Sequence, residues 1–389
     1  MNLKRWLGVF TLGAILFQIQ AMPTVWYVHP DSSLSSIQDA LDSCLTGDIV
    51  LVGPGRYVEN IIWPYTHGIK LISERGYEAT VIDADSAGSG IEIKMAVDTT
   101  TVIRGFTIQY GFAGTTWPGW GGAISCSTLA SPTIVDNKMT HCIAYTGGAI
   151  HVWGGSPLIK NNIICDNTAI GGGGGIYLIS SSARILNNVI ERNAAPSGAG
   201  IHPSCATPSN PLLIQCNTIR HNYGDGIFFS GSVCVIESCS IYGNTENGIH
   251  INGAPTTIIQ YCNICSNNAY GVCYDDTATV IPAENNWWGH PTGPYHPSTN
   301  PGGQGDQVSD YVDYTPWLGQ PWSVQETPVV RPGRKISAIV VAGPLPPQWR
   351  DKGIVYTCAG RRVAAADMRP GVYFLDLEGQ EKIKIVKVR

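Results

Sequence analysis

Small and aliphatic residues recur at a nearly fixed interval along the middle of the chain. Each recurrence begins with a small residue, usually glycine, and then places an aliphatic residue at the head of a short apolar–polar alternation. These aliphatic heads are Ile124, Ile150, Ile176, Ile201, Ile227, Ile249 and Val272. Their successive separations are 26, 26, 25, 26, 22 and 23 residues. A repeat of this length predicts a solenoid.

Two further aliphatic rows follow the heads in each unit. The first row holds Ile134, Ile159, Ile185, Ile214, Ile236 and Ile259, and the second holds Met139, Ile164, Ile190, Ile219, Ile241 and Ile264. Three short β-rich segments per unit, without a helical period, predict a coil of parallel strands. We expect both rows to point inward. At roughly 1.5 to 3 kcal/mol per buried aliphatic side chain, they would be the main source of stability.

Asparagines mark two bends in each unit. One row consists of Asn137, Asn162, Asn188 and Asn217, with Cys239 and Cys262 continuing it, and the other of Asn167, Asn193, Asn222, Asn244 and Asn267. A bend leaves backbone groups unpaired, and a stacked amide satisfies them while bonding to the equivalent amide one coil away. The rows therefore predict two amide ladders along the solenoid.

The spacing Asn-Asn-x-Ile-x-x-x-Asn, followed by Gly-Ile, resembles the repeat of right-handed parallel β-helix proteins with the pectate-lyase-like fold. This group is also called carbohydrate-binding proteins and sugar hydrolases. The resemblance covers most of the mature chain and implies an all-β fold, a right-handed parallel β-helix of roughly ten coils. It implies less about activity, because the group includes lyases, hydrolases, epimerases and non-catalytic surface proteins.

The start of the chain predicts export and a cap on the solenoid. Residues 1–21 combine Lys4 and Arg5 with an apolar run, which is typical of a secretory signal peptide, and residues 22–318 form the β-helix. No later apolar run is long enough to span a membrane. Residues 35–45 have helical periodicity, and Ser35 and Gln38 have the spacing of a capping box. We expect this helix to cover the first coil, because a solenoid end otherwise exposes its core.

The other end of the chain predicts a second cap, a linker and a small domain. Trp287 and Trp288, at outward positions of the repeat, belong to a segment that we interpret as the terminal cap, followed by a last strand within 306–318. Residues 319–334 are a Pro-rich linker, and residues 335–389 contain four strand-like runs that predict a small β-sandwich. Residues 360–363, 370–373 and 387–389 resemble the C-terminal sorting domain of the type IX secretion system. That resemblance implies secretion machinery as a partner and a secreted or outer-surface location, reached through the periplasm.

Net charge and cysteine positions limit the kinds of ligand and covalent cross-link that we expect. Residues 22–318 hold 10 Lys and Arg against 23 Asp and Glu, a net charge of −13, whereas residues 319–389 have a net charge of +6. An acidic solenoid argues against a nucleic-acid partner. All 12 cysteines lie in the exported part, where both disulfides and stacked buried thiols are open alternatives. The spacing of Cys262 and Cys265 follows from the repeat, so we predict no metal site there.

The residue after each aliphatic head should face outward, because strand side chains alternate. This outer row is Ser125, His151, Tyr177, His202, Phe228, His250 and Cys273. An insertion at residues 110–122 borders the same strands. The resemblance implies that this sheet and its loops hold polysaccharide, and the candidate carbohydrate-binding residues are Trp117, Trp120, His151, Trp153, Tyr177, His202 and Phe228. The alternative is a stack of rings that only stiffens the sheet.

Catalysis has fewer candidates. Glu92 and Asp275 lie too many coils apart to act together on one glycosidic bond. His250 and Asp275 are diagonal neighbours on adjacent coils and form a candidate acid/base couple. A polyuronate lyase of this group would need calcium-binding acids and a basic proton acceptor. Neither the outer row nor the second outward row two residues on, from Ser127 to Asp275, holds Arg or Lys from Ser125 onward. We therefore expect a non-catalytic protein that binds polysaccharide or cell-surface glycan. The alternative is a polysaccharide lyase or glycoside hydrolase acting on the same face, with calcium if it is a lyase and otherwise no evident cofactor.

Overall fold

The computed structural model describes residues 23–127, 129–204, 211–231, 233–253, 257–277 and 279–323. It also describes short strands at 339–341, 353–357, 362–364, 371–377 and 383–387. The predicted signal peptide and most of the predicted linker lie outside the described residues. Those two predictions therefore stay predictions.

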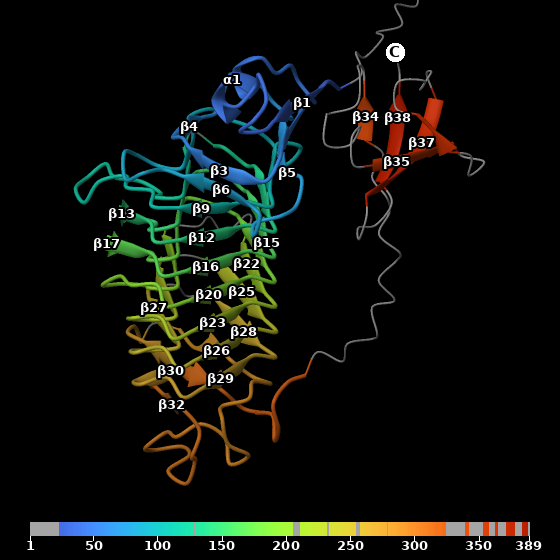
Figure 1. Cartoon of the computed structure of the whole chain (residues 1–389). Helices are drawn as coiled ribbons and strands as arrows, with labels where there is room; N and C mark the ends of the chain where they lie inside the picture. Colours follow the sequence, from blue (N-terminus) through green and yellow to red (C-terminus); the bar gives the residue numbers. More distant parts are fainter. Residues whose placement is uncertain are drawn as a thin grey trace, which may run out of the picture.

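The chain forms a right-handed parallel β-helix in which each coil returns to the same three strand positions. Parallel sheets of 10, 10 and 9 strands run along the solenoid. Helix α1 lies over one end, and β32 lies toward the other (Figure 1). The first sheet contains β1 (Val25–Val28), β2 (Ile49–Val52), β5 (Lys70–Ser73), β8 (Val102–Arg104), β11 (Thr133–Val135), β15 (Leu158–Lys160), β19 (Arg184–Leu186), β22 (Leu212–Gln215), β25 (Cys234–Glu237) and β28 (Ile258–Gln260).

The aliphatic heads of the repeat lie in the sheet that we call the platform sheet. It contains β4 (Ile61–Ile62), β7 (Ile91–Ile93), β10 (Ile124–Cys126), β14 (Ile150–Trp153), β18 (Ile176–Ile179), β21 (Ile201–Ser204), β24 (Ile227–Ser230), β27 (Ile249–Asn252), β30 (Tyr270–Tyr274) and β32 (Gln307–Val308). Successive heads are direct partners, as in the pairs Ile124–Ile150 and Ile150–Ile176. The repeat therefore sets the register of the sheet.

The third sheet completes each coil. It contains β3 (Gly55–Val58), β6 (Thr80–Asp83), β9 (Thr107–Gln109), β12 (Lys138–Thr140), β16 (Ile163–Cys165), β20 (Val189–Glu191), β23 (Thr218–Arg220), β26 (Ser240–Tyr242) and β29 (Asn263–Cys265). All members of the two predicted inner rows, from Ile134 to Ile259 and from Met139 to Ile264, are fully buried. The prediction of a stacked aliphatic core is confirmed.

Both predicted amide ladders are present. The Nδ2 group of Asn162 donates to Asn188 Oδ1 at 3.0 Å and to the carbonyl of Ile134 at 2.9 Å, and the Asn162 backbone N–H donates to the same Asn188 oxygen at 2.9 Å. Asn161, the residue before the ladder position, has a φ of 56°. This left-handed conformation makes the corner, and asparagine tolerates it better than most residues do.

Two cysteines replace asparagine in the first ladder, as predicted. The backbone N–H of Asn217 donates to Cys239 Sγ at 3.4 Å, and that of Cys239 donates to Cys262 Sγ at 3.4 Å. The N–H of Cys262 then donates to Asn286 Oδ1 at 2.8 Å, so Asn286 ends a ladder that the repeat pattern traced only to Cys262. The cysteines in the described residues are free thiols, which decides between the two alternatives for this part of the chain.

Helix α1 (Ile37–Asp42) caps the first coil with Ile37, Ala40 and Leu41 buried. It is shorter than predicted, and its N-cap is Ser36 rather than Ser35, because the Ser36 hydroxyl accepts from the Asp39 N–H at 3.2 Å. The Glu59 carboxylate, from the loop after β3, accepts from the Ile37 and Gln38 N–H groups at 2.9 Å each. A carboxylate from the next coil thus completes the cap.

Replacing Glu59 with alanine should lower the free energy of unfolding by about 1 to 2 kcal/mol, because two helix N–H groups lose their acceptor. Urea unfolding measures this change. Glu78→Ala, which removes an exposed carboxylate, is the matched control and should stay within about 0.5 kcal/mol of the wild type. Equal stability of the two variants would contradict the capping role of Glu59.

The far end closes with aromatic rings, and here one expectation is wrong. Trp287 and Trp288 are both buried rather than outward, just after β31 (Ile281–Pro282). The repeat register continues here, because Asn286 follows Cys262 in the ladder and Trp287 bridges to Asn263, so Trp288 takes the inward position that Ile264 has one coil earlier. The interpretation of this segment as a cap agrees with that burial. The predicted last strand within 306–318 is two short strands, β32 in the platform sheet and β33 (Val312–Asp313) paired with β31.

The described strands of the C-terminal segment make one mixed sheet in the order β34-β38-β37-β35-β36. They are β34 (Ile339–Val341), β35 (Gly353–Thr357), β36 (Arg362–Val363), β37 (Gly371–Leu377) and β38 (Ile383–Lys387). β34, β35, β37 and β38 correspond to the four predicted runs, and β36 is an additional short strand. The second layer of the predicted sandwich stays a prediction.

Candidate functional site

The outer row of the platform sheet forms a continuous ladder of aromatic rings. Trp120 stacks on His151 with ring centroids 5.3 Å apart and an interplanar angle of 6°, and His151 stacks on Tyr177 at 5.5 Å and 7°. Tyr177–His202, His202–Phe228 and Phe228–His250 continue at 4.8, 4.9 and 4.9 Å with steeply inclined planes. The ladder arises because consecutive coils place one ring each at paired positions of adjacent strands.

A cluster of three tryptophans stands at the start of this ladder. Trp117 and Trp153 contact Trp120 edge-on, at 5.4 Å and 75° and at 5.1 Å and 84°. Trp117 and Trp153 are 64% and 46% exposed, while the Trp120 ring between them is half-buried. We call these residues the tryptophan cluster. Its two outer rings are held in place by a third ring that is itself held by His151.

An additional pair of strands positions the loop that carries Trp117 and Trp120. β13 (Ile143–Thr146) pairs with β17 (Thr168–Gly172), beside the main solenoid. The loop joins this pair through bridges Phe112–Ile143 and Trp120–Thr146, and the Gly121 N–H donates to the Thr146 carbonyl at 3.0 Å. The predicted place of the insertion at the border of the platform sheet is therefore confirmed, and backbone hydrogen bonds fix it there.

Not all of the predicted carbohydrate-binding residues are accessible. His151 and His202 are 2% and 8% exposed. Trp120 and Tyr177 stack on His151, whereas the Tyr177 and Phe228 rings on the adjacent strands pack against His202 at steep angles. Burial lowers the pKa of His151 to about 3 and that of His202 to about 4, so both rings are neutral at pH 7. These two histidines support the ladder from within. The exposed or half-buried candidates are Trp117, Trp120, Trp153, Tyr177 and Phe228.

The other end of the ladder is polar. His250 Nε2 lies 2.9 Å from Asp275 Oδ2, so the two residues of the predicted acid/base couple do meet. His250 Nδ1 also lies 3.3 Å from Oδ2 of the buried residue Asp225. Hydrogen bonds to Asp225 and Asp275 raise the pKa of His250 to about 9. An imidazole with this pKa carries its proton at pH 7 and is a weak general base.

Two residues of this polar end were not identified as partners of His250 from the sequence. Cys273 is the direct strand partner of His250, and its Sγ lies 3.8 Å from Asp275 Oδ1. The ligand atoms of His250, Cys273 and Asp275 all lie within 4.8 Å of one another. The repeat places Cys273 in the outer row directly after His250, and this position could have identified it from the sequence as a neighbour of His250. Asp225 lies outside any strand, at the corner before β24, where the repeat gives no side-chain direction.

The carboxylates of the described platform face are already engaged. Asp225 and Asp275 both bond to His250, and Glu92 at the opposite end pairs with Lys94 at 2.9 Å. The register places four strand-to-strand steps between Trp153 on β14 and His250 on β27. At about 4.8 Å per step, that separation is about 19 Å. The tryptophan cluster and the polar end are therefore separate places on one face.

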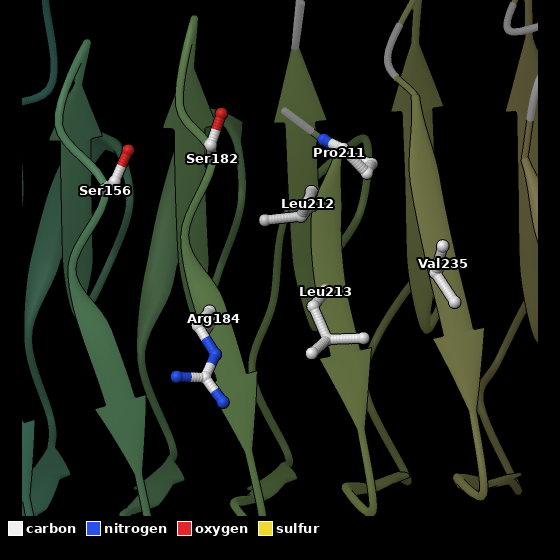
Figure 2. Close-up of a pocket in the computed structure, with 7 residues that line it drawn as sticks. All are labelled: Ser156, Ser182, Arg184, Pro211, Leu212, Leu213 and Val235. Atoms are coloured by element: carbon white, nitrogen blue, oxygen red, sulfur yellow. The ribbon is translucent and has the colours of Figure 1, made fainter. Parts of the chain in front are cut away.

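A shallow groove lies on the first sheet, away from the ring ladder. Its volume is about 410 Å³, and Figure 2 shows the side chains that line it, which come from three neighbouring coils and the turn before a fourth. The lining residues are Ser156, Ser182, Arg184, Pro211, Leu212, Leu213 and Val235. This lining lacks aromatic rings and carboxylates, so it is a poorer sugar or catalytic site than the platform sheet.

Comparison with known proteins agrees with the fold. A family model described as "Periplasmic copper-binding protein (NosD)" matches residues 52–297. No curated protein matches the chain. None of the helices in the described part of the chain reaches the length and apolarity of a membrane-crossing segment.

Several solved structures share the architecture at low identity. A double mutant of the periplasmic alginate epimerase AlgG is 13% identical, with a TM-score of 0.37, and the alignment covers 68% of this chain but only 56% of that chain. The A-module of the mannuronan C-5 epimerase AlgE4 from Azotobacter vinelandii is 16% identical (TM-score 0.42, covering 66% and 73%). Pectate lyase Pel9A is 18% identical (TM-score 0.38, covering 78% and 82%). At these values the likeness concerns the fold alone.

Proposed function

The chain belongs to the NosD family, and from that premise we propose that it is an exported β-helix protein that binds polysaccharide through the tryptophan end of its platform sheet. The observation that carries this proposal is the tryptophan cluster. Trp117 and Trp153 are exposed aromatic rings, and each contacts Trp120 edge-on. Flat apolar faces of this kind suit the apolar faces of sugar rings.

The rigidity of the cluster supports binding. Trp120 stacks on His151, and the Gly121 N–H next to it bonds to β13, so these rings are ordered before a ligand arrives. A pre-ordered site loses little conformational entropy on binding. The net charge of −13 over residues 22–318 disfavours a densely anionic chain. We therefore propose a neutral or weakly charged polysaccharide as the ligand.

Binding without cleavage is the better-supported mode. A glycosidase places two carboxyl groups across one glycosidic bond. The three rings that contact Trp120, which are His151, Trp117 and Trp153, offer no carboxylate. Glu92, two strands from His151, is paired with Lys94, and the acids of the polar end bond to His250. The alternative, a lyase or hydrolase on the same face, is an outcome of the test below.

The test is a glycan array with the full chain, followed by affinity measurement on each glycan that binds. Trp153→Ala and Trp117→Ala should each weaken binding about 10- to 100-fold, since a buried aromatic contact typically contributes 1 to 3 kcal/mol. Tyr65→Ala is the control, because Tyr65 is an exposed ring (85%) outside the cluster, and it should leave the affinity unchanged.

Two results would contradict the proposal. One is unchanged affinity in the double variant of Trp117 and Trp153, and the other is an array without any neutral glycan among its hits. Incubation of each hit, with detection of unsaturated products at about 235 nm and of new reducing ends, separates binding from the lyase and hydrolase alternatives. Product formation that is lost in His250→Ala would favour the enzyme.

Location follows from the family in part. The family is described as periplasmic, and we infer export of this chain by its N-terminal segment. Passage onward to the outer surface depends on the C-terminal sorting resemblance. Of its motif residues, 360, 361, 370, 388 and 389 lie outside the described residues, while Arg362 and Gly371 begin strands β36 and β37. The sorting role remains a prediction.

The family description also names copper. The tryptophan cluster offers no atoms that copper prefers, whereas the polar end of the ladder does. Imidazole and thiolate are favoured copper ligands, and His250 and Cys273 supply one of each beside the Asp275 carboxylate. These residues of the chain therefore fit such an ion, and they would hold it at the opposite end of the ladder from the proposed glycan site.

A further inference from the structure

The polar end of the ring ladder brings together three different metal-binding side chains. We propose that His250, Cys273 and Asp275 form a binding site for one soft or borderline cation of the copper and zinc class. Their ligand atoms lie within 4.8 Å of one another, with His250 Nε2 and Asp275 Oδ2 at 2.9 Å and Cys273 Sγ and Asp275 Oδ1 at 3.8 Å. Ligands around one tetrahedral ion lie about 3.3 to 3.8 Å apart. Small side-chain rotations would therefore close the site.

The β-helix itself produces this arrangement. His250 on β27 and Cys273 on β30 are direct partners in adjacent parallel strands, so both side chains leave the same face of the sheet. Asp275 follows Cys273 by two residues and lies just beyond the end of β30, again on that face. Two side chains thus come from fixed strands, and the third comes from a more exposed position where it is free to adjust.

A buried carboxylate orients the histidine. Asp225 Oδ2 lies 3.3 Å from His250 Nδ1, and its other oxygen accepts from the Asn247 N–H at 3.1 Å and from Asn247 Nδ2 at 2.7 Å. Nδ1 is therefore the nitrogen that donates to Asp225, and Nε2 points to Cys273 and Asp275. Metal-binding histidines commonly have such a carboxylate behind them, which fixes the ring and its tautomer. The ion would take the place of the proton between Nε2 and Asp275.

The ligand types select the cation. Calcium and magnesium require six or more oxygen ligands, and only Asp275 among the three residues supplies oxygen. A thiolate with an imidazole favours copper or zinc. Three protein ligands leave a fourth position, and the Asp275 side chain is 43% exposed, so the site opens to solvent. This geometry suits an ion that enters and leaves more than one that is permanently enclosed.

The inference goes beyond glycan binding and is tested separately. The full chain, stripped of metal under reducing conditions, is titrated with Cu(I) in competition with a chromophoric chelator, and in parallel with Zn(II) and Ca(II). We expect one equivalent of Cu(I) or Zn(II) to bind and no competition from Ca(II). X-ray absorption of the loaded protein should show one sulfur ligand at about 2.3 Å together with nitrogen or oxygen ligands.

Variants assign the site. Cys273→Ser and His250→Gln should each weaken binding at least 100-fold, and Asp225→Asn should weaken it about 10- to 100-fold while keeping the sulfur ligand. Cys265→Ser is the matched control, because this partly exposed thiol lies outside the cluster, and it should bind as the wild type does. Circular dichroism and the affinity for a glycan hit verify the fold of each variant and show whether the two sites are independent.

The proposal is overturned if Cys273→Ser binds with wild-type affinity, or if Cys265→Ser loses as much binding as Cys273→Ser does. A loaded wild type without a sulfur ligand would also overturn it, and that measurement needs no variant. Loss of glycan binding in the Trp117 and Trp153 variants with retained metal binding would leave this inference standing. A wild type that binds glycan but neither Cu(I) nor Zn(II) would overturn this inference and leave the glycan proposal standing.

Discussion

Asn188→Leu is expected to destabilise the β-helix by about 3 to 5 kcal/mol, because several buried polar groups lose their partners at about 1 to 3 kcal/mol each. In the native protein, Asn188 Oδ1 accepts from the backbone N–H and from Nδ2 of Asn162, and Asn188 Nδ2 donates to the Ile159 carbonyl and to Asn217 Oδ1. Leucine has a similar volume but offers neither donor nor acceptor. Equilibrium unfolding in urea measures the loss.

Two further variants test the ladder as the cause. Asn188→Cys should lose less stability than Asn188→Leu, because Cys239 and Cys262 already accept ladder N–H groups in this protein. Asn268→Leu changes an exposed asparagine next to the other ladder and should stay within about 0.5 kcal/mol of the wild type. The same unfolding midpoint for leucine and cysteine at position 188 would show that the amide ladder is not what stabilises the corner.

Lowering the pH from 7 to 5 should destabilise the protein by up to about 2 kcal/mol for each of His151 and His202, at about 1.4 kcal/mol per pH unit. Burial lowers the pKa of these residues to about 3 and about 4 in the folded state, whereas an unfolded histidine has a pKa of 6.5. Below pH 6.5 the unfolded chain binds protons that the folded chain does not. Stability from the neutral rings is therefore complete above pH 6.5 and is lost as the pH falls toward the folded pKa values.

Unfolding at both pH values in single variants isolates this effect from that of the acidic residues. His151→Phe and His202→Phe keep a ring in the ladder, and each should reduce the loss between pH 7 and pH 5 relative to the wild type. His151 Nδ1 has no hydrogen-bond partner, so phenylalanine there should cost little stability at pH 7. Tyr177→Phe changes a ring of the same ladder without changing titration in this range, and it should keep the wild-type slope. A slope unchanged in both histidine variants would contradict the prediction.

The sequence predicted those features that depend on the repeat alone. The spacing of Ile150 and Ile176 fixes which residues pair, and therefore also which side chains share a face. The asparagine rows predicted the ladders for the same reason, because each bend occurs at the same place in every coil. The approach of His250 to Asp275 followed from the register as well.

Features that depend on contacts between coils were beyond the repeat. Alternation shows that His151 faces outward, but not that Trp120 and Tyr177 cover it on both sides. Asp225 belongs to a corner where the repeat gives no side-chain direction. Glu59 caps a helix more than twenty positions earlier in the chain, and no local pattern links the two. Trp288 lies inward because Asn286 continues the ladder and keeps the repeat register, which the changed sequence after Val280 conceals.

The two amide ladders keep the same offset throughout the solenoid, and this makes the rest of each coil exchangeable. Successive rungs of the first ladder are separated by 25, 26, 29, 22 and 23 residues. Successive rungs of the second ladder repeat the same separations. The two rungs of each coil are five positions apart, so all variation in coil length falls on the arc outside this short segment. Foreign peptides inserted in that arc should leave the axial pitch intact, so the molecule is a ready scaffold for displaying loops at intervals of about 4.8 Å.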